Sequence, residues 1–194
     1  MVRERLGSPR ARLFVALELP RKVVEDAAGW AREAFGPAEE LRLVRPESLH
    51  VTLVFLGYHP EREIERIAEV SFGDGGEGGA FDLTPEGVVP VPRSRPRLLA
   101  LALEDAGGAL GAWQDGLSRR LETAGLYEPE KRPFWAHVTL ARVKRGARVR
   151  RGLELPGLPA ELEGPFLATR VTLFRSTLKP SGAVYDALAS VELG

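Results

Sequence analysis

The tetrapeptide His-Val-Thr-Leu occurs twice in this chain of 194 residues, once from His50 and once from His137. Successive side chains of an extended strand point to opposite faces. His50 and Thr52 are therefore expected to share one face of a strand, and His137 and Thr139 are expected to share one face of another. This repeat constrains the fold more than any other feature, because it requires two equivalent strands.

The residues that alternate with these polar side chains are apolar. In the first copy Val51, Leu53 and Phe55 are expected to share the face that packs on the core. A strand with an imidazole and a hydroxyl on one side and hydrocarbon on the other is typical of a half-buried strand that is open to a ligand. Two such strands predict the two halves of one site.

The spacing of apolar residues predicts the remaining elements. Helical spacing predicts helices over residues 21–35, 61–70 and 109–123. Apolar runs predict strands over residues 12–19, 41–45, 80–91, 98–103, 166–174 and 183–193, with a strand end at 57–60 and a hairpin-like turn at 175–182. Each half thus repeats the order strand, long helix and tetrad strand. This predicts the α+β class, with one domain over residues 1–194 built from two similar lobes whose tetrad faces line a cleft.

Composition limits the partners that this chain can have. Acidic and basic residues balance at 27 each, so an anionic ligand must be met by local charges rather than by a bulk excess. The chain has no cysteine, which excludes disulfides, thiolate catalysis and cysteine-ligated metals. With no signal peptide and no long apolar run, a cytoplasmic protein without membrane contact is expected.

Two other kinds of ligand site find little support in the sequence. Residues 73–79 are rich in glycine, but they lack the lysine and the following Ser or Thr of a phosphate-binding P-loop, so a surface loop is expected. A metal site would need a third ligand from His59 or a carboxylate, and no close spacing offers one. The sequence therefore predicts no metal and no other cofactor.

Two histidines facing one cleft suit acid and base catalysis. Histidine titrates near neutrality, so one imidazole can accept a proton while the other donates one in the same turnover. This pairing suits displacement at phosphorus, where one histidine takes the proton of the attacking water and the other protonates the departing oxygen. The neighbouring hydroxyls of Thr52 and Thr139 can donate to the non-bridging oxygens.

Beyond the tetrads, the chain resembles the two-histidine phosphoesterase superfamily, and in particular its RNA 2′,3′-cyclic phosphodiesterase branch, also called 2′-5′ RNA ligase. The similarity covers nearly the whole chain. Its segments are residues 12–16, 50–57, 134–142, 173–176 and 182–185. One position departs from the common pattern, because Ala136 precedes the second histidine where the family often has proline.

The resemblance implies two antiparallel sheets that flank a groove and the hydrolysis of terminal 2′,3′-cyclic phosphates to 2′-phosphomonoesters. By this analogy His50 is the proton donor to the 3′-oxygen and His137 is the proton acceptor from water, with Thr52 and Thr139 on the phosphate. It also implies ligation of such ends to 5′-hydroxyl ends without ATP. The implied partner is RNA with a cyclic phosphate end, acted on by a monomer.

Arg142 is a further candidate for binding the substrate phosphate. Strict alternation places it opposite His137, towards the core, unless the strand bulges or ends at Ala141. Loop arginines or Lys179 could supply the cation instead. Two other functions stay open, namely a phosphodiesterase for a small cyclic or 2′-5′-linked nucleotide and a non-catalytic protein that binds RNA ends.

Overall fold

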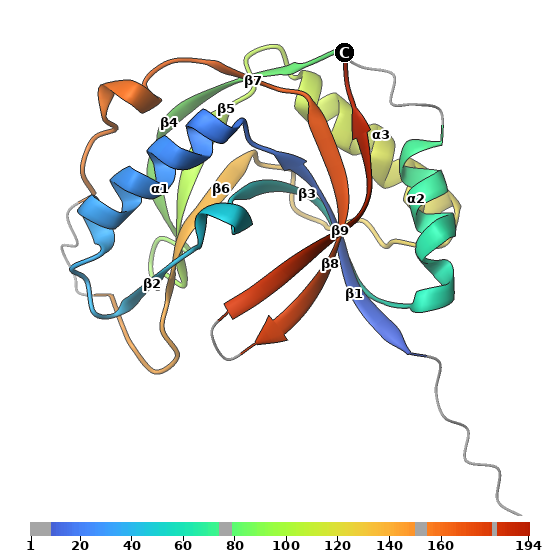
Figure 1. Cartoon of the computed structure of the whole chain (residues 1–194), viewed down its shortest axis with the longest axis horizontal. Helices are drawn as coiled ribbons and strands as arrows, with labels where there is room; N and C mark the ends of the chain where they lie inside the picture. The colour runs from blue at the N-terminus through green and yellow to red at the C-terminus, as the bar shows by residue number, and fades with distance from the viewer. Residues whose placement is uncertain (1–8, 74–78, 150–154, 180–181) are drawn as a thin grey trace, which may run out of the picture.

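A single residue pair, Val51 with Val138, joins the two halves of one curled antiparallel β-sheet (Figure 1). The computed structural model describes residues 9–73, 79–149, 155–179 and 182–194. The first half consists, in spatial order, of β3 (His50–Pro60), β1 (Arg10–Glu18), β8 (Arg170–Lys179) and β9 (Gly182–Glu192). The second half consists of β7 (Phe166–Ala168), β4 (Phe81–Val91), β5 (Leu98–Glu104) and β6 (His137–Val143), with β2 (Leu41–Leu43) also paired to β6.

The long helices cross between the halves. The helices are α1 (Arg21–Phe35), α2 (Ile64–Phe72) and α3 (Ala109–Thr123). Helix α1 directly follows β1 but packs against β2 and β6 of the other half, whereas α3 packs against α2 and β3 (Figure 1). Helix α1, which follows a strand of the first sheet half, thus packs on the second half, and α3, which follows a strand of the second half, packs on the first. These two crossings hold the two lobes together.

Both long helices form where their apolar residues make one stripe. In α1 the buried residues Ala27, Ala31 and Phe35 recur every four positions. At the start of α3 the carboxylate of Asp105 accepts hydrogen bonds from two free backbone N–H groups, which takes the place of a capping side chain at the helix N-terminus. The buried stripes and the outer face of the sheet form one apolar core. The inner, concave face is left for polar side chains.

The predicted α+β fold with two antiparallel groups of strands around a groove is confirmed, and several boundaries differ. The helix expected over 61–70 begins with a 3-10 turn at Glu61–Glu63. The strand expected over 166–174 is two strands, β7 and β8, and β8 continues to Lys179 where a turn was expected. Most of the glycine-rich segment, residues 74–78, lies outside the described residues.

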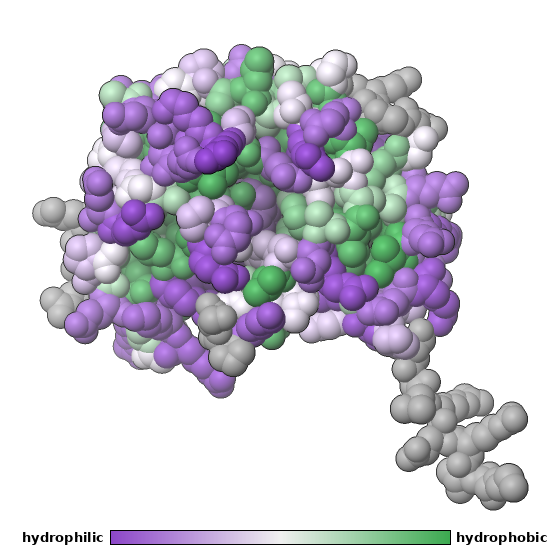
Figure 2. All heavy atoms as spheres, in the orientation of Figure 1, coloured by the Kyte–Doolittle hydropathy of each residue, from purple (hydrophilic) through white to green (hydrophobic). Residues whose placement is uncertain are grey.

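The viewed surface of the molecule is mainly hydrophilic (Figure 2). Hydrophilic side chains are spread over the whole viewed face, with smaller apolar patches among them (Figure 2). No helix in the four described ranges is both long enough and apolar enough to cross a bilayer. Because acidic and basic residues balance over the whole chain, an anionic ligand would have to be bound by a local concentration of positive charge.

Candidate active site

His50 is held at the start of β3 by two hydrogen bonds. Its Nδ1–H donates to the carbonyl of Ser48 at 2.9 Å, because a carbonyl can only accept. Nε2 then carries the lone pair, and the hydroxyl of Thr52 donates to it at 3.1 Å. The residue two positions before the histidine and the residue two positions after it thus fix both the tautomer and the direction of the ring.

Aromatic rings surround His50 on the concave face. Its ring centroid lies 5.0 Å from that of Phe14, 5.3 Å from that of Tyr185 and 6.4 Å from that of Phe174. The pKa of His50 is lowered to about 4, and removal of water by this burial is the largest cause. The hydrogen bond to Ser48 acts in the opposite direction, and the neighbouring Arg142 and His137 contribute to the lowering. His50 is therefore neutral at neutral pH when no ligand is bound.

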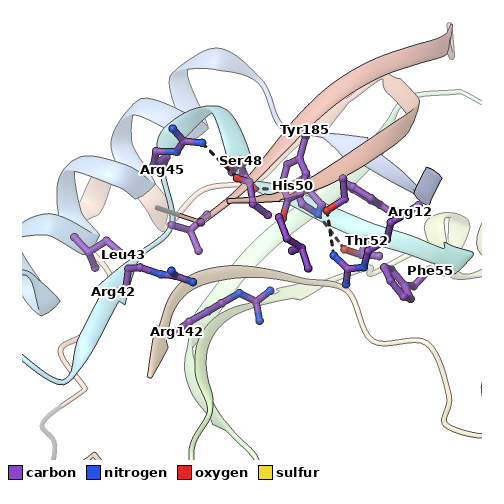
Figure 3. Close-up of a pocket in the computed structure, with 16 residues that line it drawn as sticks. Arg12, Arg42, Leu43, Arg45, Ser48, His50, Thr52, Phe55, Arg142 and Tyr185 are labelled. Carbon is purple, nitrogen blue, oxygen red and sulfur yellow. Dashed lines mark hydrogen bonds between the residues drawn. The ribbon is translucent and has the colours of Figure 1, made fainter. Parts of the chain in front are cut away.

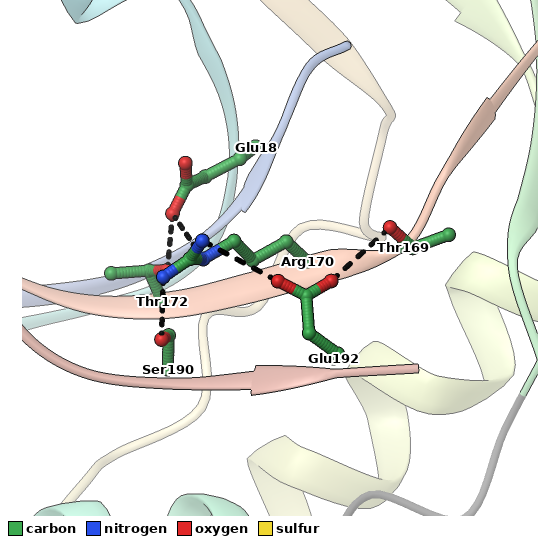
Figure 4. Close-up of polar contacts among 6 residues, drawn as sticks. All are labelled: Glu18, Thr169, Arg170, Thr172, Ser190 and Glu192. Carbon is green, nitrogen blue, oxygen red and sulfur yellow. Dashed lines mark hydrogen bonds and ion pairs between the residues drawn. The ribbon is translucent and has the colours of Figure 1, made fainter. Parts of the chain in front are cut away.

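One carboxylate lies on the strand next to His50, but its charge is engaged elsewhere. Glu18 pairs with His50 across the β1–β3 ladder. Its carboxylate accepts a hydrogen bond from Thr172 and lies 3.4 Å from Arg170, which also contacts Glu192 at 3.4 Å (Figure 4). This network satisfies Glu18 at the far end of β1, so it does not act as the ionic partner of the imidazole.

His137 repeats the backbone contact of His50 in different surroundings. Its Nδ1–H donates at 2.9 Å to the carbonyl of Trp135, again two positions earlier. The Trp135 ring stacks on the imidazole with centroids 4.4 Å apart and planes 14° apart. Nε2 is thereby directed away from the backbone, as it is in His50.

The two tetrads are arranged head to tail. Strands β3 and β6 are antiparallel and meet at Val51 and Val138, the residues between the histidine and the threonine of each tetrad. Thr139 therefore lies on the His50 side of this pair, and His137 lies on the Thr52 side. The sequence predicted this convergence, and the electrostatic effect of His137 on His50 is consistent with it.

A bulge in each tetrad strand changes which side chains reach the groove. In the β1–β3 ladder Ala16 pairs with Thr52 and Val15 with Val54, so Leu53 is the extra residue. Alternation resumes one position later, and Phe55 is 39% exposed on the groove side. The prediction that Phe55 shares the core face with Val51 and Leu53 is therefore wrong.

The second bulge places Arg142 in the groove. In the β5–β6 ladder Ala100 pairs with Thr139 and Leu99 with Ala141, so Leu140 is the extra residue. Leu140 and Ala141 are both buried, and Arg142 is exposed. Arg142 thus shares the face of His137 and Thr139, which is the exception to strict alternation that the sequence left open.

The concave face contains a cavity of about 350 Å³ beside His50 (Figure 3). Among the described residues, its lining includes four arginines and no carboxylate. The polar and aromatic lining residues are Arg12, Phe14, Arg42, Arg45, Ser48, His50, Thr52, Phe55, Arg142, Ser176 and Tyr185. His137 and Thr139, on the neighbouring strand β6, do not line this cavity.

Sequence reasoning missed Arg12, Arg42 and Arg45 as groove cations. Arg12 shares strand parity with Phe14, donates to Ser176 Oγ at 3.0 Å and lies over the Phe55 ring at 4.5 Å. Parity along the first strand could have indicated Arg12. Arg42 and Arg45 carry no such signal, because their position depends on the pairing of β2 with β6. Lys179, the alternative cation, does not line the cavity.

Metal-ligating side chains do not gather in the described part of the chain. No group of three or more His, Cys, Asp or Glu residues there could hold a metal ion. His59, the third histidine and a possible further ligand, instead directs Nε2 to the carbonyl of Leu56 at 3.1 Å. His59 is therefore a residue of the strand end and not of the groove.

Comparison with known proteins supports one family. The family model described as LigT like Phosphoesterase matches residues 101–185. An RNA 2′,3′-cyclic phosphodiesterase of Aeropyrum pernix is 33% identical over 163 residues, covering 78% of this chain and 86% of that protein. The crystal structure of TT0787 of Thermus thermophilus matches with a TM-score of 0.80 at 30% identity and covers 94% of this chain and 97% of its own. Escherichia coli LigT in apo form matches with a TM-score of 0.78 at 26% identity, covering 96% and 99%.

Proposed function

This chain belongs to the LigT-like phosphoesterases, the family of the RNA 2′,3′-cyclic phosphodiesterases, and on that basis we propose that it hydrolyses RNA 2′,3′-cyclic phosphate ends to 2′-phosphomonoesters. The observation that carries the proposal is the head-to-tail meeting of the two His-x-Thr strands at Val51 and Val138. It supports an acid and a base on opposite sides of one phosphate.

The proposed reaction needs two proton transfers. His137 Nε2 accepts a proton from water as the water oxygen forms its bond to phosphorus. The bond from phosphorus to O3′ breaks, and His50 Nε2 donates a proton to the departing O3′. The hydroxyls of Thr52 and Thr139 donate to the non-bridging oxygens, and Arg142 adds a positive charge on the same face. Imidazoles supply both proton transfers, so we propose a reaction that is independent of metal ions.

Because the pKa of His50 is low in the free protein, His50 becomes protonated only when the substrate is bound. Without a ligand its pKa of about 4 leaves the imidazole neutral near pH 7. A phosphodiester anion placed between the two histidines opposes the repulsion by Arg142 and raises the pKa of His50. The substrate thereby recruits the proton that its own leaving group requires.

The same displacement accounts for ligation. If the 5′-hydroxyl of a second RNA strand replaces water, His137 accepts the proton of that hydroxyl and the product is a 2′-5′ phosphodiester. No nucleotide cofactor is consumed, because the energy of the bond comes from the strained cyclic phosphate. The monomeric state, the cytoplasmic location and the single domain over residues 1–194 stay predictions.

Mapping the product of a cyclic phosphate end tests the function. An oligonucleotide with a 2′,3′-cyclic phosphate, incubated with the protein in the presence of a chelator, should give a 2′-phosphate end only. A 3′-phosphate product, or activity that appears only when a divalent ion is added, would contradict the proposal. Binding of 2′-phosphate ends with no turnover at any pH would instead support a non-catalytic RNA-end binding protein.

A further inference from the structure

Arg42 and Arg142 are direct neighbours across two antiparallel strands. They form one residue pair in the β2–β6 ladder. Both are exposed, and both line the cavity beside His50. In Figure 3 the two side chains extend from these strands on the same side, towards the space in front of His50.

This pair is electrostatically unfavourable in the absence of a ligand. Like charges on directly opposed residues of an antiparallel pair destabilise the sheet. Several other surface arginines lie against carboxylates, as Arg21 does with Glu25 and Arg119 with Asp115. Within the described ranges neither Arg42 nor Arg142 has such an ion pair, and no carboxylate lines their cavity. Two facing guanidinium groups without a carboxylate match the chemistry of a bound phosphate.

The pair lies at one end of the candidate active site and not at its centre. Strand β6 runs from His137 past Thr139 to Arg142, and β2 pairs with its last residues. The reacting phosphate of the proposed function lies between the two histidines, around the Val51–Val138 pair. Arg142 can add charge to the reacting phosphate, whereas a phosphate held by both Arg42 and Arg142 lies beyond it, towards β2. Such a phosphate would therefore be a second phosphate, on the His50 side of the first.

We propose that Arg42 and Arg142 form a second phosphate subsite, which holds the phosphodiester that precedes the terminal nucleotide. This inference rests on the proposed function, and it deepens that function by naming the substrate as a strand with at least two phosphates. The RNA enters the groove from the β2 end. The subsite forms no covalent bond and acts by positioning the strand.

Substrates that differ in one charge test the subsite. The three substrates are a nucleoside 2′,3′-cyclic phosphate, a dinucleotide with the same cyclic end, and that dinucleotide with a neutral methylphosphonate as its internal linkage. Loss of one charge-assisted contact in Arg42→Gln should raise KM for the natural dinucleotide by about tenfold. KM for the mononucleotide and for the methylphosphonate dinucleotide should change less than about twofold, because neither offers the second charge.

A matched variant separates this contact from a general loss of positive charge. Arg45 also lines the cavity, but its guanidinium lies 3.3 Å from Glu47 and donates to the carbonyl of Ala183 at 3.3 Å. Arg45→Gln removes the same charge, and its effect should be similar for all three substrates. A similar effect of Arg42→Gln on all three would overturn the subsite, and so would an undiminished loss with the methylphosphonate.

A binding measurement tests the subsite independently of catalysis. Calorimetric titration should show that the wild type binds a dinucleotide 2′-phosphate more tightly than a nucleoside 2′-phosphate, and that Arg42→Gln abolishes this difference. The salt dependence of dinucleotide binding should also fall, by about 0.7 in log–log slope for one lost phosphate contact with a single strand. If the wild type hydrolyses no cyclic phosphate but shows this difference, the proposed function fails and the subsite stands. Hydrolysis without this difference refutes the subsite alone.

Discussion

The two tetrad strands share one backbone design and differ in what surrounds each imidazole. In both, Nδ1–H donates to the carbonyl two residues earlier, and a leucine is the extra residue of a bulge. Three rings surround His50 and burial lowers its pKa to about 4, whereas His137 has one ring face on Trp135. Repetition of the local sequence thus sets the direction of both histidines, and rings from other strands bury His50 and lower its pKa.

The side chain that follows each bulge also differs between the two tetrad strands. Phe55 in the first strand and Arg142 in the second occupy equivalent positions, three residues after the threonine. Phe55 carries the guanidinium of Arg12 on its ring, so a neighbouring strand supplies a cation where the first tetrad has none of its own. Both ends of the groove are therefore positive, although the chain as a whole carries no net charge.

Replacing the histidines should have the largest effect and separate their roles. His50→Ala and His137→Ala should each lower kcat by about a hundredfold to ten-thousandfold with a cyclic phosphate substrate. A nitrophenyl phosphodiester, whose leaving group needs no protonation, should rescue His50→Ala much more than His137→Ala. Equal rescue of both would show that the acid and base roles are assigned wrongly.

The burial of His50 should make folding stability depend on pH. Its folded pKa of about 4 lies below the ordinary value of 6.5, so protons bind preferentially to the unfolded chain. This contribution is complete above pH 6.5 and is lost as the pH falls towards 4. The loss should be about 2 to 3 kcal/mol, reduced from the full shift because the ring edge meets water.

Denaturant unfolding of His50→Gln at several pH values measures this effect. The variant should lose most of the slope between pH 6.5 and 4, whatever its absolute stability. Arg142, His137 and the already paired Glu18 are the charged and titratable groups near His50, and they remain in the variant. His59→Gln on the same strand is the control and should keep the slope. A slope that persists in His50→Gln would show that His50 is not the group responsible.

Most of this fold follows from local patterns, and the shape of the site does not. The helix over Ala109–Thr123 was predicted to the residue because a single apolar stripe and a following glycine define it. The bulge in β3 was not predicted and the bulge in β6 was only left open as a possibility, because both arise from pairing with β1 and β5 and not from the tetrad strands alone. For the same reason sequence reasoning misplaced Phe55 and overlooked Arg42, whose neighbour Arg142 is distant in the chain.

Arg142→Gln should have a smaller effect than loss of a histidine. One lost charge-assisted contact to the substrate should lower kcat/KM by about tenfold. The same change should raise the pKa of His50, because Arg142 is one of the charges that lower it. An NMR titration of the histidine ring carbons measures this shift directly. An unchanged pKa of His50, together with an unchanged kcat/KM, would remove Arg142 from the site.

Loss of the side-chain hydrogen bond that supports the bulge in β3 should have the smallest effect of these changes, and it should affect β3 only. The carbonyl of Leu53, the extra residue in β3, accepts a hydrogen bond from the Gln114 side chain of α3 at 3.2 Å. In the second strand the carbonyl of Leu140 accepts from the backbone N–H of Val44 at 2.8 Å, which no side-chain substitution removes. The two bulges are therefore supported by different means.

Gln114→Ala removes the side-chain hydrogen bond to the carbonyl of Leu53 and should lower the free energy of unfolding by about 1 kcal/mol. Because the bulge directs Phe55 into the groove, the variant should also weaken the stacking of Arg12 on Phe55. Denaturant unfolding measures the stability, and the double variant Gln114→Ala with Phe55→Ala measures the coupling. The two losses should sum to more than the loss in the double variant, since both act on the position of one ring. Strict additivity would show that Gln114 stabilises the helix without supporting the bulge, and the difference between the two tetrad strands would then lie in their rings alone.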